Sequence, residues 1–296
     1  MLRLLASGLA FLASLPAAPT PAAAQAKAVD VGRTLEWPEA PRSQVYRLGD
    51  LALEMRNIVD PTDPSILHRS LVLRNPGASP LTIEADDGAY APTVMVVRDP
   101  SGVPIILFQT YSGGAHCCTT VQAIDTLPEG FQSILIHSGD GGPLEEAPTD
   151  LDGDGELDFV FYDNDFLYRF ASYADSFAPP TIFNIQQGEA VDVSARPGFR
   201  ALFETTFAEA RARCLDSGDQ ARNGACAAFV ASAARLGRFD QAWGEMSGAY
   251  DRSSDWGLEV CRVPMADGEC PSGQRAIGSF PEVLRSFLVE QEYIDG

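Results

Sequence analysis

The chain has 296 residues and carries 41 acidic against 21 basic side chains, a formal net charge of −20 at pH 7. This charge argues against nucleic acid and anionic membrane surfaces as partners, because both are negative and need a basic footprint on the protein. A hydrophobic content of 45% is typical of a globular protein with a buried core and excludes a disordered or fibrous chain.

Residues 1–26 have the pattern of a secretory signal peptide. Arg3 precedes an apolar run from Leu4 to Leu15, and an alanine-rich stretch with possible cleavage sites follows at 22–26. The run is too short to cross a bilayer, and no later segment reaches the roughly 20 apolar residues of a transmembrane helix. We therefore expect a mature protein without a transmembrane segment, which is periplasmic or secreted.

The next residues predict an N-terminal arm and then a β-rich domain. Residues 27–44 contain prolines and show no regular period, whereas apolar side chains mostly alternate over 45–196. Strands are expected at 50–58, 70–75, 92–99, 103–111, 118–125, 131–137, 158–162 and 166–170. Short turn-forming links favour antiparallel neighbours, so we expect a β-meander over about 90–171, as a blade-like sheet or a β-sandwich.

The pattern over 197–296 changes to that of helices. Apolar residues recur at helical spacing after Pro197, and a second helical segment is expected to stop at Gly237. Further helices are expected over 238–251 and from Phe280, where Pro281 suits a first turn. The fold class is therefore α+β: an antiparallel β-meander followed by a helical C-terminal region.

Six cysteines in a chain bound for an oxidising compartment indicate disulfide bonds. Short separations favour local pairs that brace the helical region, namely Cys214 with Cys226 and Cys261 with Cys270. The adjacent Cys117 and Cys118 either close a vicinal ring or each bond a distant partner. A catalytic thiol at Cys117, paired with His116 or His137, is disfavoured because the thiols are expected to be oxidised.

The segment "DLDGDGELD" at 150–158 carries the most specific chemical signal. Calcium prefers six to eight hard oxygen ligands, and alternating carboxylates on a tight loop can wrap such an ion. Gly155 permits the sharp bend, and Glu156 is expected to contribute its backbone carbonyl. The sequence therefore predicts a Ca²⁺ site formed by Asp150, Asp152, Asp154, Glu156 and Asp158.

The same loop differs from an EF-hand, because Phe161 stands where that motif has its last glutamate and the strand-like "DFVFY" follows. It resembles instead the calcium-binding hairpin of FG-GAP and VCBS repeats, where a DxDxDGxxD loop joins two β-strands, as in the integrin α-chain propeller. The resemblance covers about residues 131–171 and implies that Asp158 completes the cage. Because that family repeats the loop on successive blades, a single copy disfavours a complete propeller.

These features predict an exported, calcium-binding, non-enzymatic protein that binds a protein or a glycan. Two alternatives stay open: a periplasmic regulatory or inhibitor protein that acts through the helical region, and a calcium-dependent hydrolase. No nucleophile elbow, zinc HExxH motif or phosphate loop occurs in the sequence, so we assign no catalytic residue. An exposed apolar or aromatic patch without converging titratable groups would favour the binding role.

Overall fold

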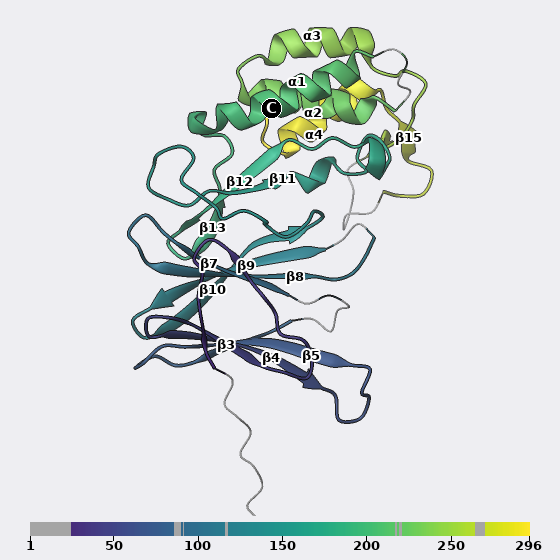
Figure 1. Cartoon of the computed structure of the whole chain (residues 1–296). Coiled ribbons are helices and arrows are strands. Elements are labelled where there is room, and N and C mark those ends of the chain that lie inside the picture. The colour runs from purple at the N-terminus through teal and green to yellow at the C-terminus, as the bar shows by residue number, and fades with distance from the viewer. Residues whose placement is uncertain are drawn as a thin grey trace, which may run out of the picture.

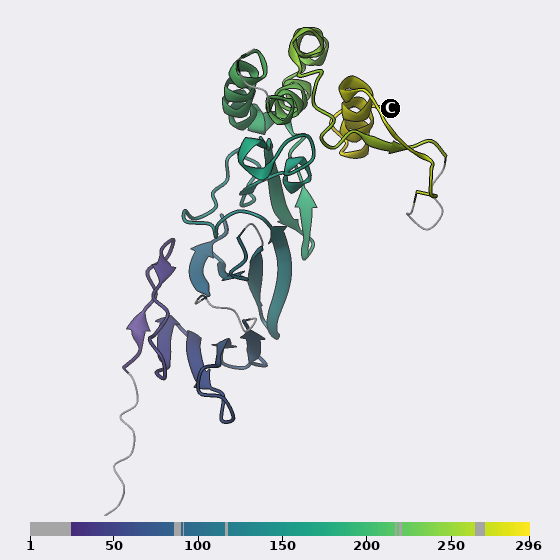
Figure 2. The same ribbon diagram turned by 90° about the vertical axis from the view of Figure 1, so that its right-hand side faces the viewer.

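The computed structural model describes residues 25–85, 90, 92–115, 118–216, 218, 221–263 and 270–296. These residues stack in layers: two five-stranded sheets, a three-stranded sheet and a group of helices (Figure 1). The layers follow one another in chain order except for β2, which joins the second sheet although it precedes most of the first. The turned view shows the same succession, with the C-terminal β-hairpin projecting from the helical end (Figure 2). The α+β fold class predicted from the sequence is confirmed.

The outer sheet has the strand order β1-β3-β4-β5-β6 and is antiparallel except where β1 meets β3. Its strands are β1 (Lys27–Ala28), β3 (Gln44–Leu48), β4 (Leu51–Val59), β5 (Leu67–Arg74) and β6 (Leu81–Glu84). Alternate side chains on β4 and β5 are fully buried and face the next sheet: Leu53, Met55, Leu71 and Leu73. Glu54, which lies between Leu53 and Met55 on β4, points to the opposite face of the sheet and forms ion pairs with Arg56 and Arg74. Charged side chains of this kind are typical of the solvent-facing side of an antiparallel sheet.

The central sheet is a meander of consecutive antiparallel strands with a short strand added at its edge. The strands are β2 (Thr34–Leu35), β7 (Thr93–Arg98), β8 (Pro104–Tyr111), β9 (Thr119–Leu127) and β10 (Gly130–Gly139). Val94 and Phe108 pack against the outer sheet, whereas Met95 and Leu107 face the third layer. Burial on both faces explains why β7 and β8 are almost continuously apolar.

The third layer is an antiparallel sheet of β11 (Phe159–Tyr162), β12 (Pro180–Gln186) and β13 (Glu189–Asp192). Phe159 and Phe161 pack on the central sheet, while Ile182 and Val193 face the helices. The strands that flank the acidic loop, β10 and β11, therefore lie in different sheets. The loop connects two layers rather than two neighbouring strands of one hairpin, and the meander ends at Gly139.

The strand expected over 166–170 is wrong. Its first residue ends a short 3₁₀ turn, η1 (Asn164–Phe166), and Tyr168 has a left-handed φ of 58°, which an extended strand does not contain. Phe166 and Phe170 are buried, and their rings lie edge-on to that of Phe287 at 4.9 and 5.3 Å. The apparent alternation comes from two aromatic residues that anchor this segment in the helical core.

The helical region confirms the helices expected after Pro197. They are α1 (Arg200–Cys214), α2 (Asn223–Arg235), α3 (Phe239–Ala249) and α4 (Phe280–Glu290), and the 3₁₀ turns η2 (Tyr173–Asp175) and η3 (Pro197–Phe199) precede them. Gly237 follows α2 with a φ of 70°, which suits a helix stop, and Pro281 lies in the first turn of α4. A hairpin of β14 (Glu259–Cys261) and β15 (Arg275–Ile277) separates α3 from α4.

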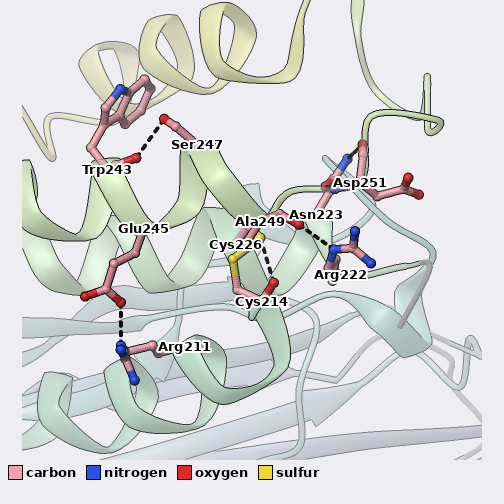
Figure 3. The surroundings of a disulfide bond; sticks show 10 residues. All are labelled: Arg211, Cys214, Arg222, Asn223, Cys226, Trp243, Glu245, Ser247, Ala249 and Asp251. Atoms are coloured by element: carbon pink, nitrogen blue, oxygen red, sulfur yellow. Dashed lines mark hydrogen bonds and ion pairs between the residues drawn. A yellow bond between two sulfur atoms is a disulfide. The ribbon is translucent and has the colours of Figure 1, made fainter. Parts of the chain in front are cut away.

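The Cys214–Cys226 disulfide joins the end of α1 to the start of α2, as expected (Figure 3). Both cysteines are fully buried. Two hydrogen bonds beside the disulfide hold α3 in place: Arg211 Nε donates to Glu245 Oε2 at 2.7 Å, and Arg222 Nε donates to the Ala249 carbonyl at 2.7 Å (Figure 3). The cross-link therefore lies at the junction of three helices.

The second expected disulfide, Cys261–Cys270, is also confirmed and braces the β14–β15 hairpin. Cys117 lies outside the described residues, so both alternatives, a vicinal ring with Cys118 and bonds to distant partners, stay untested. Residues 1–24 of the expected signal peptide also lie outside them. Within the part of the chain that the structure describes, no helix combines the length and the apolar character needed to cross a membrane.

Candidate metal centre

The acidic loop at 149–158 is closed by an antiparallel bridge between its two ends. The Asp158 backbone N–H donates to the Thr149 carbonyl at 3.0 Å, and β11 begins at the next residue. Gly153 and Gly155 have φ angles of 81° and 91°, a conformation that glycine adopts without strain. The two glycines therefore let the chain turn tightly enough for carboxylates of the loop to converge.

Three of the predicted ligands come together. Asp150, Asp152 and Asp158 each offer a carboxylate oxygen, and these oxygens all lie within 4.8 Å of one another. Calcium binds oxygen at about 2.3–2.6 Å, so ligands on opposite sides of one ion are about 5 Å apart. The cluster has the dimensions for one such ion, and its oxygen donors suit calcium or magnesium better than zinc, which prefers nitrogen and sulfur.

Asp158 is the buried member of the cluster, with 2% of its surface exposed. Its Oδ2 accepts a hydrogen bond from the Leu151 N–H at 2.6 Å, and its Oδ1 accepts one from Asn184 Nδ2 at 2.6 Å. Asn184 is itself fully buried on β12 and donates to the Leu157 carbonyl at 2.9 Å. These partners fix the carboxylate, and each oxygen retains a lone pair for a cation.

The other two clustered carboxylates are held mainly by the backbone. Asp150 accepts the N–H groups of Gly153 and Gly155 at 2.7 and 3.0 Å, and Asp152 accepts that of Asp154 at 3.1 Å. The turn η3 packs directly on the loop, because a Cβ added to Gly198 would lie 2.2 Å from Asp152 Cβ. The loop is therefore braced from inside and from the neighbouring turn.

Asp154 and Glu156 are not among the three clustered carboxylates, so their roles as ligands stay predictions. Asp154 forms an ion pair with Arg196, whose guanidinium also donates to Asn184 Oδ1 at 3.0 Å and lies 3.7 Å from Asp152. Glu156 is exposed, and its N–H donates to Asp154 at 2.9 Å. The positive charge of Arg196 offsets part of the repulsion among the aspartates.

Sequence reasoning missed Asn184 and Arg196. Asn184 stands 26 residues from Asp158, and Arg196 stands 42 residues from Asp154, so no local spacing links them to the loop. The one available signal is Asn184 itself, an amide inside the apolar run "TIFNI" of β12. A buried amide needs a polar partner, which here is the loop.

The catalytic-thiol alternative receives no support from the described residues. His137 on β10 stacks on the Phe161 ring at a centroid distance of 4.2 Å. Burial lowers the pKa of His137, and a hydrogen bond with the Asp140 backbone opposes this effect. Cys117 and His116 lie outside the described residues, so any pairing between them stays untested.

Comparison with known proteins gives one family match in the helical region and two longer pairwise matches. Residues 203–292 match the family described as the sll0997 C-terminal domain. The chain is 39% identical over 222 residues to the "Probable thylakoid lumen protein sll0997" of Synechocystis, a match that covers 72% of this chain and 64% of that protein. It is 36% identical over 193 residues to the "Uncharacterized protein y4bJ" of Sinorhizobium fredii, which covers 64% of this chain and 30% of that protein. The chain thus spans less than two thirds of either relative, and no solved structure matches it.

Proposed function

We propose that the chain is an exported calcium-binding protein that acts by binding a protein or a glycan and not by catalysis. The disulfides Cys214–Cys226 and Cys261–Cys270 support export because such bonds persist in oxidising compartments. The Synechocystis relative, whose name is "Probable thylakoid lumen protein sll0997", supports it as well. A periplasmic or secreted location fits both observations.

The observation that carries the calcium proposal is the convergence of Asp150, Asp152 and Asp158 on one point. An ion that binds only the folded loop stabilises the protein by RT ln(1 + [L]/Kd), about 2.7 kcal/mol at a hundred times Kd. Since β11 follows the loop directly, this stabilisation acts where the chain passes from the central sheet to the third layer.

Exposed aromatic side chains support the binding role. Tyr162, Tyr168 and Trp256 are 64%, 46% and 46% exposed. Tyr168 and Trp256 lie together, because the indole N–H donates to the Tyr168 carbonyl at 2.8 Å. Tyrosine and tryptophan present an apolar ring and a polar group at once, which makes them frequent contacts in binding surfaces.

Calorimetric titration of the mature protein with CaCl₂, together with thermal melts in EDTA and in calcium, tests the metal site. The double variant Asp150→Asn, Asp152→Asn removes two of the clustered charges. The matched control Glu145→Gln, Glu146→Gln removes two exposed charges just before the loop. We expect saturable binding and a raised Tm in the wild type and the control, and loss of both effects in the aspartate variant.

Absence of heat and of any Tm shift at about 10 mM CaCl₂, which is above the usual range of extracellular sites, would overturn the calcium proposal. Tighter binding of MgCl₂ than of CaCl₂ would assign the site to the smaller ion. Fractionation of cells that express the full chain tests export separately, because a cytosolic, uncleaved chain contradicts it whatever the ion does.

A further inference from the structure

A cleft of about 360 Å³ lies where the central and third sheets meet the helices. Its walls come from the residues just after β10, from the end of β11, from the segment 164–178 that contains η1 and η2, and from α1. Its polar and aromatic lining includes Asp140, Tyr162, Tyr173, Thr205, Thr206 and Glu209. The volume lies within the range of small-ligand sites, about 300–1,000 Å³, and none of the clustered aspartates lines it.

The sheet side of this cleft is held rigidly by Asn164. Its amide nitrogen donates to the carbonyls of Asp140 and Tyr162 at 3.4 and 2.9 Å, and its Oδ1 accepts the Asp140 N–H. Gly139 leaves room for this amide, because a Cβ there would lie 2.3 Å from Asn164 Oδ1 and would displace it. The backbones that carry Asp140 and Tyr162 are therefore fixed relative to each other, which lowers the backbone part of the ordering cost of binding.

Tyrosine rings supply flat surfaces at the cleft. Tyr162 is the most exposed of them, and Tyr173 hydrogen-bonds to the Asp140 carboxylate. The Tyr168 ring lies 5.5 Å from that of Tyr173 and extends the aromatic surface beyond the cleft. The left-handed backbone of Tyr168 is unusual for a residue with a side chain, and the hydrogen bond from Trp256 to its carbonyl holds it there.

The opposite wall is one face of α1. Thr205 and Glu209 stand four residues apart, one helical turn, with Thr206 beside them. None of the three side chains has a hydrogen-bond or ion-pair partner among the described residues. The helix therefore presents two hydroxyls and a carboxylate whose bonding capacity is available to a ligand.

The charge and the functional groups of the lining residues indicate which class of ligand the cleft can bind. Among the described residues that line the cleft there is no lysine, arginine or histidine, whereas two carboxylates are present, so an anionic ligand is disfavoured. Carboxylates form strong hydrogen bonds with hydroxyl groups, and tyrosine faces pack against C–H surfaces. We propose that the cleft binds a saccharide, whose hydroxyls reach Asp140 and Glu209 and whose ring face lies on Tyr162 and Tyr173. This assignment rests on the proposed binding function and does not depend on calcium.

Calorimetry and ligand-observed NMR of the mature protein with chitotriose, cellotriose, maltotriose and mannotriose test the assignment. Tyr162→Ala removes an aromatic face, and Glu209→Gln removes a carboxylate. Leu135→Ala is the matched control for the first variant, since Leu135 is 56% exposed on β10 and does not line the cleft. Glu189→Gln, at an exposed position on β13, is the control for the second.

We expect at least one trisaccharide to bind saturably with a Kd below about 10 mM, each cleft variant to weaken it about tenfold or more, and both controls to stay within about twofold. The saccharide assignment would be overturned if none of these sugars bound, or if the cleft variants bound them as well as the control variants do. It would also be overturned if the cleft, with its two carboxylates, bound the cationic peptide trilysine and no sugar. Parallel CaCl₂ titration separates the two proposals. Calcium binding without sugar binding refutes this cleft alone, and sugar binding without calcium binding refutes the metal site alone.

Discussion

Replacing Asp158 by asparagine should destabilise the protein even without a divalent ion. Its two carboxylate oxygens accept hydrogen bonds from the Leu151 N–H and from Asn184, each at 2.6 Å, in a place that is almost fully buried. Asparagine has a similar shape but one acceptor oxygen, so one donor would face an NH₂ group. A buried polar group without a partner costs about 1–3 kcal/mol, and the free energy of unfolding should fall by that amount.

Urea unfolding in EDTA and in CaCl₂ measures this effect, with Asp150→Asn as the comparison. Asp150 is exposed, so its replacement should change the free energy of unfolding in EDTA by less than about 1 kcal/mol. The proposed calcium site predicts that both variants also lose, in calcium, the stabilisation by the ion expected for the wild type, about 2.7 kcal/mol at a hundred times Kd. Equal stability of the two variants in EDTA would refute the role of the buried carboxylate.

Three further changes test other parts of the fold. Gly198→Ala should lower Tm and weaken calcium binding, because its methyl would lie 2.2 Å from the acidic loop, whereas Gly248→Ala on an open helix face should be neutral or stabilising. Replacing Cys214 and Cys226 together by serine should cost about 3 kcal/mol in urea unfolding, the loop-closure value for their separation of 12 residues, and an unchanged midpoint would contradict this. Burial above all raises the pKa of Tyr293, so the stability that its neutral phenol contributes is complete below about pH 10 and is lost as pH rises towards the folded-state pKa. Melts from about pH 9 to about pH 11 should therefore show a shallower alkaline fall for Tyr293→Phe, and parallel curves would contradict the burial of that hydroxyl.

Much of the fold follows from local patterns. Each strand or helix can be recognised from its own residues, as in the apolar runs of β7 and β8 and in the helical spacing after Pro197. The short separation of the cysteines likewise predicts both confirmed disulfides. The prediction of a strand over 166–170 failed because alternating aromatic residues are compatible both with a strand and with an irregular segment that buries two aromatic rings. Deciding between them requires knowledge of the helices that receive Phe166 and Phe170, and these helices come later in the chain.

The candidate metal site also has a part that the sequence predicts and a part that it does not. Asp150, Asp152 and Asp158 belong to one short loop, so their spacing alone predicts that they meet. Asn184 and Arg196 reach the loop only because the third sheet folds back beside it, which no local period encodes. The cleft is less predictable still, because its walls come from two sheets and a helix.

The central sheet, buried on both faces, has a consequence for the chain as it emerges N-terminus first. Once residues up to Gly139 are available, the outer sheet can already cover Val94 and Phe108. Met95 and Leu107 remain exposed to solvent until the third sheet has folded, and β10 is the edge strand of the central sheet. An apolar face beside an open edge invites association with other chains. We therefore expect a nascent chain paused before β11 to be prone to association with other chains.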